Sequence, residues 1–335
     1  MAKENMIGMD IGNSTLKMAV CQDGVPEQFI RVPLPDNLVS NDDITSWDAM
    51  GQFIKSSLSE NKVRTRNVAL SLPDRHLIVH RVSMPLMTIG QLKVNLPYEF
   101  RAYINENKDQ YIYDYSVVNI KKDPDKPGKG EMDLIAVAME RDLLAKYKDM
   151  FGKVGLKLCT VSPEAFALKN IIDEYEEERE ITGKRDYAIL DLGAKSVKIH
   201  FFTDGVFDIT RVLDPGCDEF IRMTASILDV DQHVARLKFE NNVDGIQESE
   251  DMVSRYSDLA VEIMRTMNFY RYNHQDSNLD SLYVCGGGVC ILRLLQSIQE
   301  SLDVTLRSSR KLIPDEDPSF DRMILCPQAL GVAWE

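Results

Sequence analysis

The chain contains 335 residues, 44% of them hydrophobic, which is enough for about two globular domains with ordinary apolar cores. Acidic residues number 53 and basic residues 39, and the resulting net charge of −14 argues against nucleic acid or an anionic membrane surface as a direct partner. No window approaches the roughly 18 uninterrupted apolar residues of a membrane span, so we expect a cytoplasmic chain without direct membrane insertion.

The first predicted elements are two strands within residues 6–20, MIGMDIGNSTLKMAV, joined by a polar turn. Most hairpins turn over two residues, whereas this turn is wider and rich in backbone N–H and hydroxyl groups. Gly12 lets the backbone approach a ligand closely, and Asn13, Ser14 and Thr15 add hydrogen-bond donors. The stretch therefore predicts a hairpin that can bind phosphate.

A compact α+β segment is expected in residues 66–154. Thr88 and Gln91 have the spacing of a capping box, which predicts the start of an amphipathic helix running toward residue 104. A loop at 121–130 is rich in proline, glycine and lysine. The expected strands are 68–72, 76–84, 111–118 and 134–138, and a second helix is expected at 141–154.

The first hairpin occurs again, because residues 190–206 align without gaps on residues 9–25. Asp10 aligns with Asp191 and Gly12 with Gly193, and a tight Asp-Gly turn follows each copy. The repeat predicts two related lobes whose polar turns face each other across a cleft. The candidate binding residues of the two turns are Asp10, Gly12, Asn13, Ser14, Thr15, Lys17, Asp191, Gly193, Ala194, Lys195 and Ser196.

The two aspartates would repel a phosphate that they touched directly. We therefore expect Asp10 and Asp191 to act through Mg²⁺, which keeps much of its hydration shell when it binds to carboxylates. Lys17 can place a positive charge on the phosphate. The paired turns thus predict a polyphosphate site that includes a magnesium ion.

A further glycine cluster, Gly286, Gly287 and Gly288, follows a predicted buried strand at 282–285 and precedes an amphipathic helix at 291–302. This order of strand, glycine turn and helix is a nucleotide-binding layout, although such turns also serve close packing of a strand and a helix. Together with the paired hairpins, it favours a nucleotide as the ligand.

Two D-x-G hairpins followed by a glycine-rich loop resemble the actin-like ATPase superfamily. Within it, residues 66–104, 154–172 and 259–273 and the closing ALGVAW resemble the PilM family of type IV pilus assembly proteins. The resemblance implies an α/β, actin-like ATPase fold with two related lobes around a nucleotide cleft and an inserted α+β subdomain in the first lobe. It implies ATP and Mg²⁺ as cofactors with weak or no ATP hydrolysis, and it adds Gly216 and Lys238 to the cofactor-binding residues.

The expected division of the chain assigns residues 1–65 and 155–182 to the core of the first lobe and 66–154 to the insert. Residues 183–335 form the second lobe, in which 225–262 are a small outer subdomain and the C-terminal helix returns toward the first lobe.

Two positions depart from the pattern of the resembled proteins. Ala235 stands where relatives often carry a glutamate that holds the ribose, so its effect on nucleotide affinity is open. Ser162-Pro163-Glu164 replaces an aspartate that is followed two residues later by glutamate. Glu164 is the candidate catalytic carboxylate, but Ser-x-Glu is also ordinary helix capping, which we favour.

The resemblance also implies a partner, the N-terminal cytoplasmic tail of a PilN-like single-pass membrane protein, which would hold the chain at the inner face of the membrane. Self-association and other pilus-assembly partners stay open. Methionine suits an adaptable binding surface, with core packing as the alternative. The candidate groove residues are Val82, Met84, Leu86 and Met87.

Other functions remain open at this stage. An FtsA-like cell-division or filament protein would share the fold, as would a phosphotransferase of the sugar-kinase class. A kinase needs a general base beside its acceptor hydroxyl, and only Glu164 is a candidate. A degenerate actin-like fold that binds no nucleotide is the fourth reading, favoured by Ala235.

Overall fold

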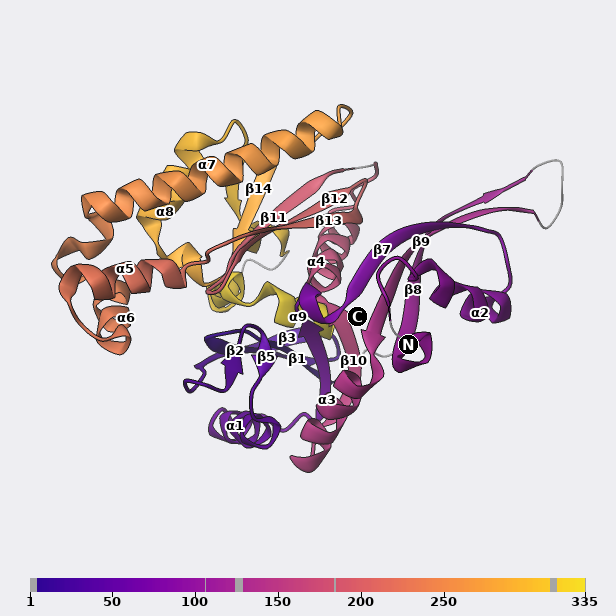
Figure 1. Cartoon of the computed structure of the whole chain (residues 1–335), viewed down its shortest axis with the longest axis horizontal. Coiled ribbons are helices and arrows are strands. Elements are labelled where there is room, and N and C mark those ends of the chain that lie inside the picture. Colours follow the sequence, from indigo (N-terminus) through magenta and orange to yellow (C-terminus); the bar gives the residue numbers. More distant parts are fainter. Residues whose placement is uncertain (1–4, 106, 124–128, 184, 314–317, 335) are drawn as a thin grey trace.

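The computed structural model describes residues 5–105, 107–123, 129–183, 185–313 and 318–334, so part of the loop expected at 121–130 lies outside the described residues. Two five-stranded sheets form the centres of two lobes, and a smaller three-stranded sheet projects from the first lobe (Figure 1).

The first sheet has the strand order β10-β6-β1-β2-β3. Its three antiparallel strands form a meander, and two parallel strands extend it on the side of β1. The parallel strands come from distant parts of the chain, so the sheet brings their carboxyl ends together at one edge. The strands are β1 (Met6–Ile11), β2 (Thr15–Gln22), β3 (Val25–Pro33), β6 (Asn67–Leu72) and β10 (Lys157–Pro163).

The second sheet, of order β13-β12-β11-β14-β15, repeats this plan of a meander followed by two parallel strands. Asp10 lies opposite Lys17 in the first meander, and Asp191 lies opposite Lys198 in the second. The predicted repeat of two related lobes is confirmed. The strands are β11 (Tyr187–Leu192), β12 (Val197–Thr203), β13 (Val206–Leu213), β14 (Ser281–Cys285) and β15 (Thr305–Ser308).

Helices cover both faces of the first sheet. On one face α1 (Trp47–Glu60) and α3 (Arg141–Lys153) complete a hydrophobic core with Met50, Ile54 and Phe151. On the other face lie α4 (Glu164–Glu178) and α9 (Pro327–Ala333). A short pair of strands, β4 (Val39–Ser40) and β5 (Asp43–Ile44), follows the meander.

The second lobe carries its own core, in which α7 (Glu250–Asn273) and α8 (Leu292–Ser301) pack on the second sheet. At its outer end, α5 (Asp218–Leu228) and α6 (Gln232–Glu240) lie beside each other. The helix expected at 291–302 thus corresponds to α8, one residue shorter at each end.

The inserted subdomain contains β7 (Ile78–Pro85), β8 (Tyr111–Lys122) and β9 (Gly130–Glu140) in the order β7-β9-β8, covered by α2 (Ile89–Glu99). The capping box of Thr88 and Gln91 at the start of α2 is confirmed, with both of its hydrogen bonds present. The helix ends at Glu99 rather than near residue 104, because Pro97 supplies no N–H to its last turn.

Two boundaries of this region were predicted wrongly. Residues 74–76 form a short 3₁₀ turn, so the strand expected from residue 76 begins at Ile78. The insert is also narrower than residues 66–154, because β6 pairs with β1 in the first sheet and α3 packs beside α1. The strands β6 and β7 follow each other along the chain with similar compositions. No sequence pattern therefore marks the point at which the chain passes from the first sheet to the insert.

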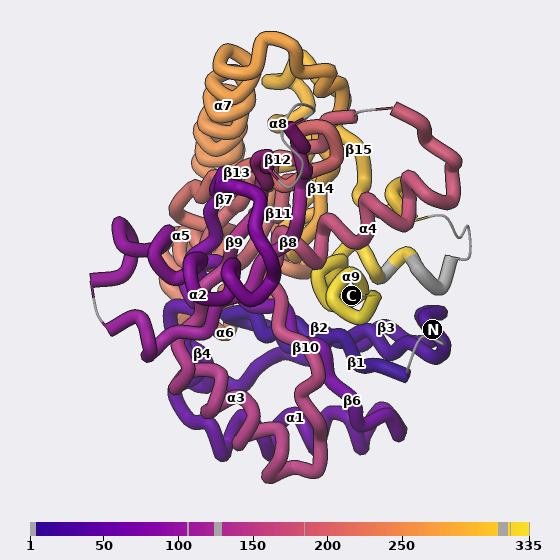
Figure 2. The backbone as a smooth tube through the Cα atoms, turned by 90° about the vertical axis from the view of Figure 1, so that its right-hand side faces the viewer, coloured from indigo at the N-terminus to yellow at the C-terminus, as the bar shows by residue number. Residues whose placement is uncertain are grey.

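The helix α9 lies between the two lobes in both views of the backbone (Figure 1 and Figure 2). It belongs to a hydrophobic cluster in which Leu330 of α9, Leu168 of α4 and Ile189 of β11 are buried together. Close backbone contacts hold it there, since a Cβ on Gly8 would lie 1.7 Å from the carbonyl oxygen of Ala329. Within the described part of the chain, none of the helices combines the length and apolarity that crossing a membrane requires.

Candidate functional site

The polar groups of the two lobes meet where the first strands of the two meanders end. Asp10 is the last residue but one of β1, Asp191 holds the same place in β11, and the two residues are only 5% and 8% exposed. Ser71 lies beside Asp10 in the sheet register, and Ser162 lies beside Ser71. The carboxyl ends of these strands thus bring carboxylates and hydroxyls together where the two lobes meet, which is the place of the predicted cleft.

In the first hairpin, Lys17 pairs with the aspartate of its own hairpin. Its Nζ lies 2.8 Å from Oδ2 of Asp10. Burial lowers the pKa of Lys17, but the charges of Asp10 and Asp191 outweigh burial and raise the pKa above its usual value. Because the charge of Asp191 helps to raise the pKa of Lys17, the second hairpin lies close enough to the first for their charges to interact, as the repeat predicted.

The second hairpin uses the matching residues differently. Nζ of Lys198 pairs with Oε2 of Glu164 at 2.5 Å, which joins β12 of the second lobe to α4 of the first. Asp191 instead accepts a hydrogen bond from the Gln328 side chain, with 2.7 Å between Nε2 and Oδ2. The other carboxylate oxygen of Asp191, Oδ1, is buried without a partner among the described residues.

The interpretation of Glu164 as part of a helix cap is wrong. The N-cap of α4 is Pro163, no side chain caps this helix, and Ser162 lies one position before the N-cap. Glu164 is buried beside the cleft, where burial raises its pKa to about 7 although Lys198 opposes that shift. Its carboxylate therefore lies where the two lobes meet, paired with Lys198.

The turn of the first hairpin leaves fewer free donors than expected. The N–H of Gly12 donates to the carbonyl of Thr15 at 3.0 Å. The side-chain amide of Asn13 donates to the carboxylate of Asp42, and Oδ1 of Asn13 accepts from the N–H of Asp42 at 2.9 Å. Asn13 thus holds the β4–β5 turn, and Ser14 and Thr15 are the predicted donors left at this turn.

The turn of the second hairpin is fixed by the loop that precedes α5. The carbonyls of Gly193, Ala194 and Lys195 accept hydrogen bonds from the N–H groups of residues 216–218 at 2.8 to 2.9 Å. Gly216 packs so closely on this turn that a Cβ would lie 2.4 Å from the N atom of Ser196. The loop therefore engages the carbonyl side of the turn, and Lys195 is exposed.

The glycine cluster lies against Asp191. Gly286 has a φ of +88°, and a Cβ at this residue would lie 2.3 Å from Oδ1 of Asp191. Gly288 is buried against Leu192, whereas Gly287 is exposed at the start of a 3₁₀ turn that leads into α8. The cluster thus lets β14 approach β11 closely, and it leaves Gly287 accessible to a ligand.

The α6 positions contribute less to the site than expected. Ala235 is fully buried in the core of the second lobe, where it packs with Phe239 and neighbouring apolar side chains. Lys238 is partly exposed on the same helix. The absence of a glutamate at position 235 is therefore compatible with tight apolar packing at this point of α6.

Buried polar atoms without a hydrogen-bond partner gather at this cleft. Within the described residues they include Oγ of Ser71, Oγ of Ser162, Oδ1 of Asp191 and Oε1 of Gln328. Buried polar atoms are ordinarily satisfied by protein or water, and those that are not call for an explanation. A polar ligand with its ordered water supplies one.

Sequence reasoning missed three residues of this network. Lys198 could have been found, because the repeat aligns it with Lys17. Gln328 gave no signal, since it reaches Asp191 from a helix 137 residues further along the chain. Asp74 lies in the 3₁₀ turn after β6, and its charge raises the pKa of Glu164 after the larger effects of burial and Lys198.

The predicted partner groove needs a correction. Val82 and Met84 are each 5% exposed in the core of the insert, because alternate residues of β7 face α2. Leu86 and Met87 are partly buried at the edge of that core. Val82 and Met84 therefore pack inside the insert, and Leu86 and Met87 form an accessible edge of its core.

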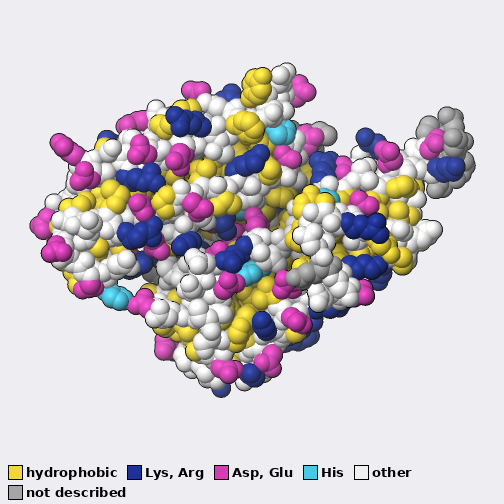
Figure 3. Space-filling model, viewed as in Figure 1, with side chains coloured by type: hydrophobic (Ala, Val, Ile, Leu, Met, Phe, Trp, Pro, Cys, Tyr) yellow, Lys and Arg dark blue, Asp and Glu magenta, His cyan; other side chains and the backbone are white. Residues whose placement is uncertain are grey.

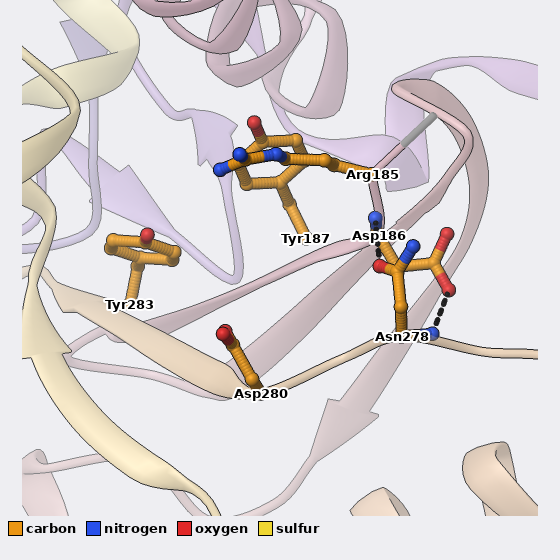
Figure 4. Close-up of a pocket in the computed structure, with 6 residues that line it drawn as sticks. All are labelled: Arg185, Asp186, Tyr187, Asn278, Asp280 and Tyr283. Atoms are coloured by element: carbon orange, nitrogen blue, oxygen red, sulfur yellow. Dashed lines mark hydrogen bonds between the residues drawn. The ribbon is translucent and has the colours of Figure 1, made fainter. Parts of the chain in front are cut away.

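A separate hollow of about 330 Å³ lies at the amino-terminal ends of β11 and β14 (Figure 4). Asp186 and Asn278 exchange two hydrogen bonds in it, of 2.9 and 3.1 Å. None of the predicted site residues lines it. It is lined by Arg185, Asp186, Tyr187, Asn278, Asp280 and Tyr283.

The surface agrees with the acidic composition. Figure 3 shows acidic and basic side chains interspersed over the face that it draws, with a notch between the two lobes at the left of the view. His233 of α6 and Asp36, which follows β3, approach to 3.1 Å between Nε2 and Oδ2, so the small outer end of the second lobe touches the first lobe.

A family model described as type IV pilus assembly protein PilM matches residues 8–308 of the chain. A comparison with curated proteins gave no match.

Solved structures share the fold. The PilM–PilN type IV pilus biogenesis complex aligns with a TM-score of 0.81 at 21% identity, over 99% of this chain and 98% of that chain. The ethanolamine utilization protein EutJ from Carboxydothermus hydrogenoformans aligns with a TM-score of 0.60 at 12% identity, over 100% and 90%. An archaeal actin homologue reaches 0.51 at 12% identity, over 98% of both chains. The fold is thus the actin-like ATPase fold.

Proposed function

The chain belongs to the family of type IV pilus assembly protein PilM, and from this membership we propose that it is an ATP-binding scaffold of pilus assembly or a related secretion or DNA-uptake system. In this proposal it works in the cytoplasm, bound to the inner face of the membrane through a partner. ATP occupies the interlobe cleft, and the N-terminal tail of a single-pass PilN-like protein docks on the insert.

The observation that carries the nucleotide part is the gathering of unpaired buried polar atoms at the cleft, on both lobes. A phosphate chain between the two turns would lie beside Lys17, whose charge stays on at neutral pH. In this proposal the N–H groups of the second turn also bind the phosphate, on the side opposite the carbonyls that accept hydrogen bonds from residues 216–218.

The donor set also suits a magnesium ion. Oδ1 of Asp191 and Oε1 of Gln328 are both buried and unpaired, and oxygen ligands are those that Mg²⁺ prefers. No group of three or more His, Cys, Asp and Glu side chains that could hold a metal occurs among the described residues. The ion would therefore take most of its ligands from water and phosphate, and its charge would draw the phosphate toward Asp191.

Calorimetric titration with ATP, in Mg²⁺ and in EDTA, tests this site. Asp191→Asn should weaken binding at least tenfold in Mg²⁺ and much less in EDTA, because the carboxylate acts through the ion. Asp10→Asn should also weaken binding in Mg²⁺, but in EDTA it frees Lys17 from its 2.8 Å ion pair and should strengthen phosphate binding.

Asp186→Asn is a matched control, because that aspartate lies at the opposite edge of the second sheet. Equal losses in both buffers for Asp10→Asn and Asp191→Asn would rule out the assignment to the ion. A wild-type protein that binds no ATP in either buffer would favour the degenerate actin-like fold.

The docking part is supported by the pilus family and by the shape of the insert. A tail that is disordered when free must bury apolar side chains to offset the cost of ordering. Leu86 and Met87 offer such an edge beside the insert core, directly before α2. Ile89, at the first position of α2, is 65% exposed and extends the apolar surface.

A pull-down with the cytoplasmic tail of the single-pass protein encoded beside this gene tests the docking. Leu86→Asp combined with Met87→Asp should reduce tail affinity at least tenfold, because two charges would enter the apolar edge. Val234→Asp combined with Leu237→Asp, at two exposed apolar positions of α6 in the second lobe, is the control with the same charge change.

Unchanged affinity in the Leu86 and Met87 variant, with its fold intact by circular dichroism, would place the groove elsewhere. If the wild-type protein binds no such tail, the adaptor function loses its main support.

A further inference from the structure

A second hollow, of about 400 Å³, lies at the base of the first lobe, where the C-terminal ends of α1 and α3 come together (Figure 1). Arg66 directly precedes β6 and Leu156 directly precedes β10, so the hollow lies at the amino ends of these parallel strands. The cleft lies at their carboxyl ends. The two sites are therefore on opposite edges of the first sheet.

The lining of this hollow is strongly basic although the whole chain carries a net charge of −14. No aspartate or glutamate lines it, and Glu60 at the end of α1 lies outside the lining. The basic lining residues, which we call the basic set, are Lys55, Lys62, Arg64 and Arg66.

Within the part of the chain that the structure describes, no ion pair joins any of the four members of the basic set to an acidic group. Lys153, the last residue of α3, directly precedes the lining residue Val154. Unlike the basic set, it forms ion pairs, with Asp48 at 3.1 Å and with Asp149 at 2.8 Å. Acidic partners are thus available nearby, and the hollow lacks them.

Helix dipoles account for only part of this charge. Each helix C-terminus carries roughly half a negative charge, so α1 and α3 together balance about one of the four cations. Backbone N–H groups already satisfy carbonyls there, since Val63 donates to Leu58 and Leu156 donates to Phe151, each at 2.9 Å. An excess of about three positive charges remains.

The hollow is built firmly enough to select a ligand. Val63, Val154 and Leu156 are buried in the first-lobe core and fix its floor. Two guanidinium groups supply planar pairs of N–H donors that match phosphate oxygens, and two lysines add mobile charges. We propose that this hollow is a binding site for a phosphate-bearing anion, separate from the interlobe cleft.

Titration with pyrophosphate, in saturating MgATP so that the interlobe cleft is already filled, and sedimentation with vesicles test the proposal together. Vesicles contain 30% phosphatidylglycerol in phosphatidylcholine, with pure phosphatidylcholine as the uncharged reference. Wild-type protein should bind at least one probe, and Arg64→Glu combined with Arg66→Glu should lose at least tenfold in affinity. Lys146→Glu combined with Lys148→Glu changes the charge equally on the exposed side of α3 and should stay within twofold of wild type.

Lys62→Gly is the second variant, because it keeps the fold. Lys62 has a φ of +60°, a left-handed conformation that glycine adopts without strain, so this variant removes the charge and preserves the turn. We expect a loss of several-fold in affinity with an unchanged or higher melting temperature.

The probes also separate the sources of the phosphate. Pyrophosphate binding alone indicates a soluble ligand, and vesicle binding, with or without pyrophosphate binding, indicates a lipid headgroup. Binding of neither probe by the wild-type protein overturns the proposal, as does an equal loss in the Arg64/Arg66 and Lys146/Lys148 variants. If the Arg64/Arg66 variant keeps its affinity for both probes, the anion binds elsewhere and the proposal is overturned as well.

Discussion

At the scale of single residues, the two hairpins show one pattern with two uses. Lys17 and Lys198 occupy equivalent positions opposite equivalent aspartates. Lys17 neutralises Asp10 within its own hairpin, whereas Lys198 turns to Glu164 and leaves Asp191 to Gln328. The lysine and aspartate of the first hairpin therefore pair with each other, whereas those of the second hairpin pair with residues of α4 and α9.

This arrangement predicts slow ATP hydrolysis. A general base must be free to accept a proton from water, but Glu164 is held by Lys198, and protonation competes for it because burial raises its pKa to about 7. We expect a steady-state rate well below about 1 s⁻¹, the low end for kinases. Malachite-green detection of phosphate measures it, with Glu164→Gln as the variant and Glu174→Gln, further along α4, as its control. A rate above that value, abolished in Glu164→Gln with ATP binding intact, would show that Glu164 activates water efficiently.

The aspartates and the lysines could be located from the sequence because the repeat aligns them without gaps. Their partners could not. Glu164 is 34 residues from Lys198, and Gln328 is 137 residues from Asp191, so both pairs depend on how the lobes pack. The capping assignment of Glu164 failed for a local reason, since α4 begins one residue later than the Ser-x-Glu pattern suggested.

At the scale of elements, α9 depends on two glycines. A Cβ on Gly331 would lie 1.8 Å from the carbonyl oxygen of Ala167 in α4, and a Cβ on Gly8 would meet the backbone of Ala329. Backbone atoms cannot give way as a flexible side chain can, so these glycines fix the distance between α9 and the elements on either side. The sequence placed this helix near the first lobe by resemblance, but the contacts that hold it have no sequence signal.

Gly331→Ala should therefore lower the free energy of unfolding by at least about 2 kcal/mol through overpacking. Gly152→Ala in α3 is the matched control, because no atom lies within 4 Å of its added Cβ. That change should stabilise the protein by up to about 1 kcal/mol through helix propensity. Urea unfolding followed by circular dichroism measures both, and similar effects of the two substitutions would contradict the role of close packing at α9.

At the scale of the whole molecule, stability should depend on pH through two buried groups whose pKa values shift in opposite directions, His200 and Glu164. His200 of β12 is fully buried, and burial lowers its pKa to about 4, with Lys198 acting in the same direction and Asp74 and Asp191 against it. At His200 the folded protein binds fewer protons than the unfolded chain between pH 6.5 and 4, so the contribution of His200 to stability is complete above pH 6.5 and is lost as the pH falls toward 4, by about 3 kcal/mol. At Glu164, whose pKa is raised to about 7, the folded protein binds more protons than the unfolded chain, so the contribution of Glu164 changes in the opposite direction as the pH falls.

Urea unfolding at pH 7 and pH 5 checks the histidine contribution by comparing variants with the wild type. Between pH 7 and pH 5 the wild type should lose about 2 kcal/mol more stability than His200→Gln, whereas His233→Gln, on the exposed surface of α6, should respond to pH as the wild type does. If His200→Gln responds to pH as the wild type does, His200 does not govern the acid sensitivity.

The position of α9 also has a consequence for how the protein is made. The first-lobe elements up to α4 leave the ribosome early, but the helix that covers β1 beside them is synthesised roughly 150 residues later, after the whole second lobe. At the usual speed of translation this interval lasts on the order of 10 to 30 seconds. During that time α4 covers only part of this face of the first sheet. The apolar residues of β1 and β2 that α9 will cover stay exposed on the nascent chain, where a chaperone can bind them.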